Sequence, residues 1–143
     1  MSPALAQIAE EFQALPEPER LQLLLEFSNN LPELPERYVG HPELLERVAE
    51  CQSPVWIIVE VNEGSVEVFA QAPAEAPTTR GFASILIEGL HGLSVQEVLD
   101  VPADYPSELG LSRAISPLRL RGMTGMLGRI QRQTALKAGV LPE

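Results

Sequence analysis

Apolar residues recur along the chain with two different periods, and these periods predict the order of its secondary structure. Near the N-terminus, apolar residues spaced three or four apart predict an amphipathic helix over residues 4–14. A second helix is predicted over residues 18–30, with Pro18 in its first turn, where the missing N–H costs nothing. The prolines and glycine of residues 31–42 predict an irregular connector. A short helical piece is predicted over residues 43–48.

The middle of the chain changes to the pattern of a small sheet. Residues 55–59 are β-branched and aromatic, which favours a buried strand. Turn residues at 62–65 are followed by alternating apolar positions at 66–70, so the two runs predict an antiparallel hairpin. A short third strand is an option between Pro73 and Pro77.

Helical signals return in the last third of the chain. Thr79 is predicted to cap a helix over residues 80–90, and residues 94–97 form a capping box that begins another. Ser116 and Pro117 are typical of a helix start, and apolar spacing continues that helix to about Ala138. The prediction is therefore a single α+β domain over residues 1–143, with an antiparallel sheet of two to three strands flanked by N-terminal and C-terminal helices.

Charge is spread unevenly along this predicted fold. The chain has 20 acidic residues against 10 lysines and arginines, a formal net charge of -10. Residues 1–110 carry most of the acidic residues, whereas residues 111–143 are basic. The acidic total argues against a nucleic-acid binder and against an anionic membrane surface as partner. On charge alone, contact between a basic helix and an acidic body of the same chain is favoured over a docking surface for an acidic partner.

The rare chemical groups of the sequence exclude several classes of protein. One cysteine cannot form an internal disulfide, and one cysteine with two histidines cannot build the common structural zinc sites, so no metal is expected. No phosphate-binding loop or serine-nucleophile motif is found. No signal peptide is visible at the N-terminus, and a reduced, cytoplasmic location is the expectation.

Cys51 stands out because of its neighbours. Glu50, Gln52 and Ser53 are polar, and Pro54 prevents a helix from continuing through this segment. A lone cysteine is more often an inert buried residue. On a loop before a buried strand, however, a thiol can be presented to a partner or held in a cavity.

Several motifs appear in the order of one known family. Cys51-Gln52-Ser53 followed by Val55-Trp56-Ile57 resembles the G-C-Q-S-x-V-W signature of the SufE family. Residues 31–35 resemble its L-P-x-L segment, Arg80-Gly81 its basic-glycine pair, and residues 116–123 its S-P-x-R-x-x-G helix start. Together these similarities span residues 4–138.

Three positions depart from the family pattern. Glu50 occupies the place where the family usually has glycine, and Ala114 the place where many members have histidine. Glu75 aligns with a position that is often aspartate. A carboxylate next to Cys51 is expected to raise the pKa of the thiol, unless a basic residue of the C-terminal helix offsets it.

The resemblance implies a role in sulfur transfer for iron–sulfur cluster assembly. Members of the family accept sulfur from a SufS-type cysteine desulfurase, stimulate it, and carry the sulfur as a cysteine persulfide to an iron–sulfur scaffold complex. It implies that Cys51 is the acceptor and that pyridoxal phosphate belongs to the desulfurase, so no cofactor is expected on this chain. We expect the thiol to be largely shielded in the free protein.

Other residues receive supporting roles by the same resemblance. Glu50, Gln52, Ser53 and Trp56 would support the loop, and Arg119, Arg80 and Glu75 would contact the partner; Arg119 has the acidic body of its own chain as the alternative contact. Two other functions stay open at this point. The protein could be an adaptor with an inert buried cysteine that docks through its basic C-terminal helix, or a thiol hydrolase whose histidine is supplied by the fold.

Overall fold

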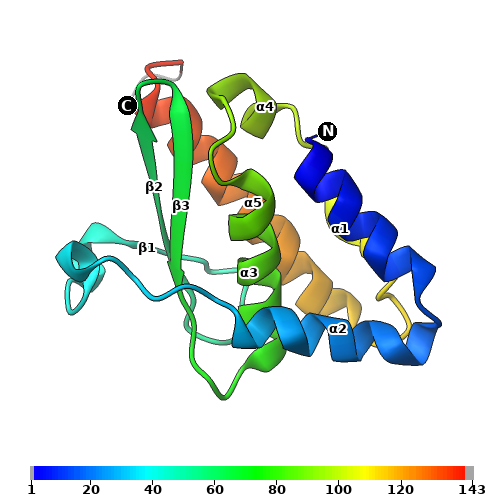
Figure 1. Cartoon of the computed structure of the whole chain (residues 1–143). Coiled ribbons are helices and arrows are strands. Elements are labelled where there is room, and N and C mark those ends of the chain that lie inside the picture. The colour runs from blue at the N-terminus through cyan, green and yellow to red at the C-terminus, as the bar shows by residue number, and fades with distance from the viewer. Residues whose placement is uncertain (1, 141–143) are drawn as a thin grey trace.

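The computed structural model, which describes residues 2–140, is an α+β fold in which five helices flank a three-stranded sheet (Figure 1). The helices are α1 (Pro3–Ala14), α2 (Glu17–Asn29), α3 (Pro77–Leu90), α4 (Val95–Leu99) and α5 (Pro117–Lys137), the strands are β1 (Glu46–Arg47), β2 (Trp56–Asn62) and β3 (Ser65–Gln71), and short 3₁₀ turns lie at Glu36–Tyr38, Pro42–Leu44 and Tyr105–Leu109. Within the described residues, no helix combines the length and apolar character needed to cross a bilayer.

Helix starts follow the local signals of the sequence closely. The Ser2 hydroxyl accepts a hydrogen bond from the Leu5 N–H, and Ser94 and Glu97 form both halves of the capping box. Ser116 accepts from the Arg119 N–H at 3.3 Å, and Pro117 follows as the first residue of α5. The starts of α1, α4 and α5 are therefore fixed by short-range chemistry.

The sheet has the order β1-β2-β3, and both pairs of neighbours are antiparallel. Strands β2 and β3 form a hairpin whose two-residue turn places Glu63 and Gly64 at positive φ, 53° and 80°. On the other edge of β2, Glu46 pairs with Ile57 and Arg47 pairs with Trp56.

Beyond the short strand β1, side chains of α5 cover the edge of β2. The Val59 N–H donates to Oε1 of Gln133 at 2.8 Å, and the Lys137 ammonium donates to the Val59 carbonyl oxygen. Gln133 and Lys137 lie four residues apart on one face of α5, so both side chains can reach this one residue of β2. Helix α5 is thereby fixed along β2.

Helix α3 lies at the centre of the molecule, where it packs against α1, α2, α5 and β3 (Figure 1). Nearly its whole length is buried, from Gly81 to Ile87 and again at Gly89 and Leu90. A Cβ at Gly81 would lie 2.6 Å from the Leu24 carbonyl oxygen, so glycine is needed for this close approach of α2. The core thus forms around α3.

The structure corrects three details of the sequence prediction. Residues 43–48 do not form a helix: a 3₁₀ turn ends at Leu44 and the segment continues as β1, because Glu46 and Arg47 pair with β2. The third strand of the sheet is therefore β1, and not a strand between Pro73 and Pro77. Thr79 is not a cap, since α3 begins two residues earlier at Pro77, whose fixed φ suits a first helical turn.

Candidate functional site

Cys51 lies in the connection between β1 and β2, which we call the Cys51 loop (residues 48–55). The Val48 N–H donates to the Val55 carbonyl at 2.9 Å and closes the base of the loop. Inside it, the Cys51 N–H donates to the Val48 carbonyl at 3.1 Å and forms a tight turn. Val55 and Val48 are fully buried, so the base of the loop is anchored in the core while its middle is free of regular structure.

The Cys51 thiol is buried against the first half of α5. Its residue is 7% exposed, and Sγ lies 3.6 Å from the Gly122 carbonyl oxygen, to which the thiol donates a weak hydrogen bond. A Cβ at position 122 would lie 3.1 Å from Sγ, closer than ordinary van der Waals contact. Gly122 therefore allows the thiol to lie directly on the helix, as expected for a shielded cysteine.

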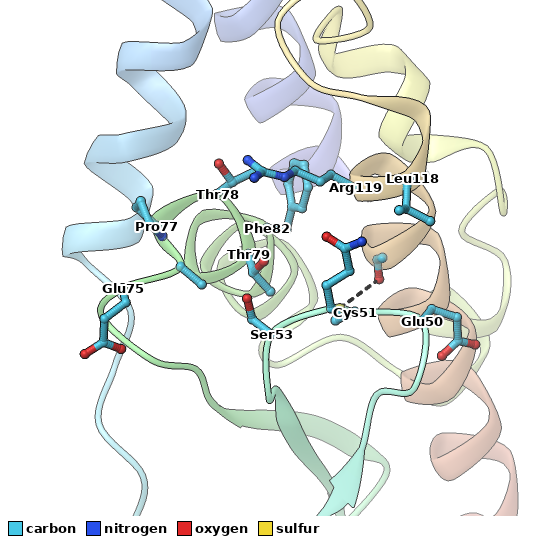
Figure 2. A pocket seen from close by; sticks show the side chains of 13 residues that line it. Glu50, Cys51, Ser53, Glu75, Pro77, Thr78, Thr79, Phe82, Leu118 and Arg119 are labelled. Carbon is cyan, nitrogen blue, oxygen red and sulfur yellow. Dashed lines mark hydrogen bonds between the residues drawn. The ribbon is translucent and has the colours of Figure 1, made fainter.

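A pocket of about 160 Å³ opens beside this thiol (Figure 2). Its walls come from three segments far apart in the sequence: the Cys51 loop, the start of α3 with the residues before it, and the start of α5. The lining residues are Glu50, Cys51, Gln52, Ser53, Glu75, Ala76, Pro77, Thr78, Thr79, Phe82, Leu118, Arg119 and Gly122. Six of the residues that the sequence singles out are thus brought together around one small cavity.

Two of those six residues, Arg119 and Glu75, face the pocket differently (Figure 2). The Arg119 side chain extends across the opening toward Thr78 at the start of α3, whereas the Glu75 carboxylate points away from the thiol. Arg119 is exposed, and within residues 2–140 no carboxylate lies within ion-pair distance of its guanidinium. Of its two expected contacts, the one with the acidic body of the chain is absent from this part of the structure.

Two other predicted site residues lie outside the pocket. Arg80 is in the first turn of α3 and donates to the Ala72 carbonyl at 2.7 Å, beside a separate hollow lined by residues 31–34. Trp56 is the half-buried first residue of β2, opposite Arg47 of β1. Arg80 therefore ties α3 to the end of β3, and Trp56 lies directly after the Cys51 loop, where β2 begins.

The surroundings of Cys51 keep its thiol protonated. The pKa of the thiol is raised from 9.0 to about 11, chiefly because burial disfavours the thiolate and secondly because of the Glu50 carboxylate. The positive charges of Arg129 and Arg47 oppose this rise. The rise that Glu50 was expected to cause and the opposing effect of a basic residue of α5 are both present, and burial makes the largest contribution to the raised pKa.

Arg129 and Gly125 are residues of this region that the sequence analysis did not identify. Arg129 donates to the Glu50 carboxylate at 2.8 Å and so holds the residue next to Cys51. A Cβ at Gly125 would lie 2.7 Å from three side-chain carbons of Glu50. A signal was available, since glycines at positions 122, 125 and 128 recur at the spacing of one helix face, and glycine inside a helix often has a packing reason.

The alternative function as a thiol hydrolase requires a histidine near Cys51, and the structure places neither histidine there. Neither histidine lines the pocket: His41 lies beside Glu43 on the exposed connector, and His91 follows the end of α3. Among residues 2–140, no three acidic, histidine or cysteine side chains gather closely enough to hold a metal ion. The chemical group that the pocket presents is the Cys51 thiol, with Arg119 across from it.

Comparison with known proteins finds a matching family and several similar sequences. Residues 6–134 match the family model described as "SufE: Fe-S metabolism associated domain". An uncharacterized SufE-like protein, present in two strains of Mycobacterium tuberculosis, is 48% identical over 130 residues, which cover 90% of each chain. The SufE-like protein 1 of Arabidopsis thaliana, described as chloroplastic/mitochondrial, is 30% identical over 93% of this chain and 35% of its own.

A solved structure agrees with these sequence matches. The solution structure of a hypothetical protein from Thermus thermophilus superposes with a TM-score of 0.85 at 40% identity, over 97% of this chain and 98% of the other. The family match covers all three segments that line the Cys51 pocket. The chain belongs to the SufE family, whose domain is associated with iron–sulfur metabolism.

Proposed function

We propose that the protein accepts persulfide sulfur from a cysteine desulfurase on Cys51 and delivers it for iron–sulfur cluster assembly. The observation that carries this proposal is the position of the thiol. It lies on a loop with an anchored base, buried against Gly122, at the wall of a pocket that a partner side chain can enter. A sulfur carrier needs this combination, because a bound persulfide must be shielded from free thiols and yet reach a donor and an acceptor.

The transfer requires one thiol of this chain and no net oxidation. Cys51 first loses its proton to solvent or to a base of the partner. Its thiolate then attacks the outer sulfur of the donor persulfide, as in thiol–disulfide exchange. The S–S bond of the donor breaks, its electron pair stays on the inner sulfur of the donor cysteine, and that sulfur takes up a proton. One persulfide and one thiol are consumed, and one persulfide and one thiol are formed.

In this proposal, movement of the loop also controls the protonation of Cys51, because burial raises the pKa of its thiol. With a pKa of about 11, the buried thiol is almost entirely protonated at neutral pH and reacts slowly. Movement of the loop toward the partner removes the burial that is the main cause of this rise. The same movement therefore exposes the sulfur and favours the reactive thiolate.

Arg119 and Leu118 are the residues that we assign to partner contact. Both are exposed on the first turn of α5 and both line the pocket of Cys51. A cation in a first helical turn is unfavourable for the dipole of its own helix, so an external anion would be a stabilising partner for Arg119. We assign that anion to a desulfurase of the SufS type, which would supply pyridoxal phosphate from its own chain, in a shared cytoplasmic compartment.

Intact-protein mass spectrometry tests this function directly. Incubation with a SufS-type desulfurase and free cysteine should increase the mass by one sulfur atom, and dithiothreitol should reverse the increase. Because the chain has one cysteine, the site is unambiguous. Cys51→Ser should remove both the mass increase and the stimulation of the desulfurase. The control omits free cysteine, and full stimulation by the serine variant would refute the proposal.

Burial of the thiol favours one other function, that of an adaptor with an inert cysteine. In that case α5 supplies the docking surface through exposed arginines such as Arg121 and Arg132. Cys51→Ser would then bind and stimulate the desulfurase as the wild-type protein does, and no persulfide would form. The mass experiment therefore separates the two functions.

A further inference from the structure

A short network of ion pairs joins the Cys51 loop to the sheet through α5. The Arg129 guanidinium donates through Nε to Glu50 at 2.8 Å and through Nη1 to Glu46 of β1 at 2.6 Å. Glu50 is the residue immediately before Cys51, whereas Glu46 belongs to a paired strand. One guanidinium thus connects a loop residue to a residue of the sheet, and we call these three side chains the Arg129 network.

The sheet end of the Arg129 network is held rigidly. Gln133, a buried residue one turn further along α5, donates to the other oxygen of Glu46 at 2.8 Å. Its own amide oxygen accepts from the Val59 N–H of β2 at 2.8 Å. Glu46 therefore has two partners on α5 as well as its strand pairing, whereas among the described residues Arg129 is the side-chain partner of Glu50.

The Glu50 side chain also lies directly on the backbone of α5. Its Cβ, Cγ and Cδ occupy the space above Gly125, where an added Cβ would lie 2.7 Å from each of them. One turn earlier, Gly122 gives the same kind of space to the sulfur of Cys51. Consecutive residues of the loop are thus placed on consecutive glycines of one helix face, with Arg129 holding the first of them.

We propose that Arg129 is a positioning residue for Cys51: by holding Glu50 against Gly125, it keeps the neighbouring thiol buried, and release of this ion pair lets the loop expose it. The proposal concerns the accessibility of the thiol in the free protein, and only its consequence for sulfur transfer rests on the proposed function. An exposed ion pair shifts an equilibrium between closed and open loops by up to roughly fivefold. Loss of the pair should therefore accelerate reactions of the thiol by about two- to fivefold.

For Arg129→Met, the loss of positive charge by itself predicts a slower reaction of the Cys51 thiol, which is the opposite of the change expected from loop opening. The Arg129 charge lowers the pKa of Cys51, so removing that charge without moving the loop would leave less thiolate and slow the reaction at neutral pH. If Arg129 positions the loop, its removal exposes the thiol and speeds the reaction, most of all with a reagent too large for the closed pocket. The direction of the change in Arg129→Met separates these two roles.

The experiment measures alkylation of Cys51 in the full chain, with iodoacetamide as the small reagent and a polyethylene-glycol maleimide as the bulky one. Arg129→Met should raise the rate with the bulky reagent, and the ratio of bulky to small rates, by about two- to fivefold. Arg129→Lys keeps the charge and should restore much of the closed state. Arg132→Met is the matched control, because Arg132 is exposed on the same helix and makes no ion pair within the described residues.

A second variant tests the same idea without changing any charge. Gly125→Ala should displace Glu50 sterically and produce the same rise in the rate ratio, and it keeps the test decisive if Arg129→Met does not fold. Thermal melts establish that each variant is folded. A slower reaction of Arg129→Met with both reagents at an unchanged ratio would overturn the proposal, as would an unchanged ratio in Gly125→Ala. No desulfurase is present, so this result is independent of the test of sulfur acceptance.

Discussion

Replacing Gly122 by alanine is expected to destabilise the protein and expose Cys51, although the same change at Gly128 of α5 should stabilise it. Alanine in a helix interior is favoured over glycine by about 1 kcal/mol. At position 122, however, the new Cβ would lie 3.1 Å from Sγ of Cys51 and 3.8 Å from the Glu50 carbonyl oxygen. Overpacking of this kind costs about 1–3 kcal/mol. The expected net change is a loss of roughly 0–2 kcal/mol.

Gly128→Ala is the matched control for this prediction. Gly128 lies on the same helix and is exposed. Beyond its own stretch of helix, a Cβ added there would meet no atom of residues 2–140 within 4 Å, so only the gain in helix propensity of about 1 kcal/mol applies. For a domain of this size, 1 kcal/mol corresponds to about 4 °C in Tm. We expect Gly128→Ala to melt about 4 °C above wild type and Gly122→Ala about 0–8 °C below it.

The thiol reports the same contact independently of stability. Rotation of the Cys51 side chain about χ1 would move Sγ away from the new methyl group and into the pocket. We therefore expect Gly122→Ala to be alkylated faster than wild type. Gly128→Ala should react at the wild-type rate. Thermal melts and alkylation rates on the same samples measure both effects. If Gly122→Ala melted as high as Gly128→Ala and reacted at the wild-type rate, the close contact between Cys51 and α5 would be refuted.

Three further predictions follow from contacts of single side chains. Because burial raises the pKa of Cys51 to about 11, its thiolate fraction at neutral pH is about 100-fold lower than for a pKa of 9.0, and its alkylation rate should keep rising toward pH 11; a plateau near pH 9 would contradict this. Arg119→Ala should change stability by less than about 0.5 kcal/mol yet weaken desulfurase binding, with a smaller loss at high salt, as titration calorimetry at two salt concentrations would show. Gln133→Ala leaves the Val59 N–H unpaired and should cost about 1–3 kcal/mol in urea unfolding, and wild-type stability would show that water replaces the amide.

The parts of the fold that the sequence predicts well are those that short-range chemistry determines. The hydroxyl of Ser116 and the ring of Pro117 act within one turn, so the start of α5 is predicted correctly. Strand β1 is missed because Glu46 and Arg47 carry no strand pattern of their own and are extended only through their pairing with β2. Leu44, Leu45 and Val48 have helical spacing, but Leu44 is exposed, so no common buried face forms.

The same distinction between local and long-range determinants applies to the candidate site. The residues around Cys51 are contiguous, and their motif identifies the loop directly. Arg129 lies 79 positions from Glu50, and the sequence contains several arginines on the same helix. The rotation of α5 about its axis, together with its position along the sheet, decides which of them reaches Glu50. That rotation is set by distant contacts such as the one between Gln133 and Val59, which no local pattern encodes.

The cover that α5 places over the edge of β2 has a consequence for behaviour at high concentration. An open strand edge is a template on which a second chain can add a strand and begin to aggregate. Strand β1 occupies only the first part of this edge, and it adjoins the Cys51 loop, whose opening belongs to the function proposed above. Beyond it, Gln133 and Lys137 bind the N–H and the carbonyl of Val59 from a helix that has no free edge of its own. If the Cys51 loop opens as we propose, the N–H and carbonyl of Val59 stay bound to α5, and this point of β2 stays closed to a foreign strand.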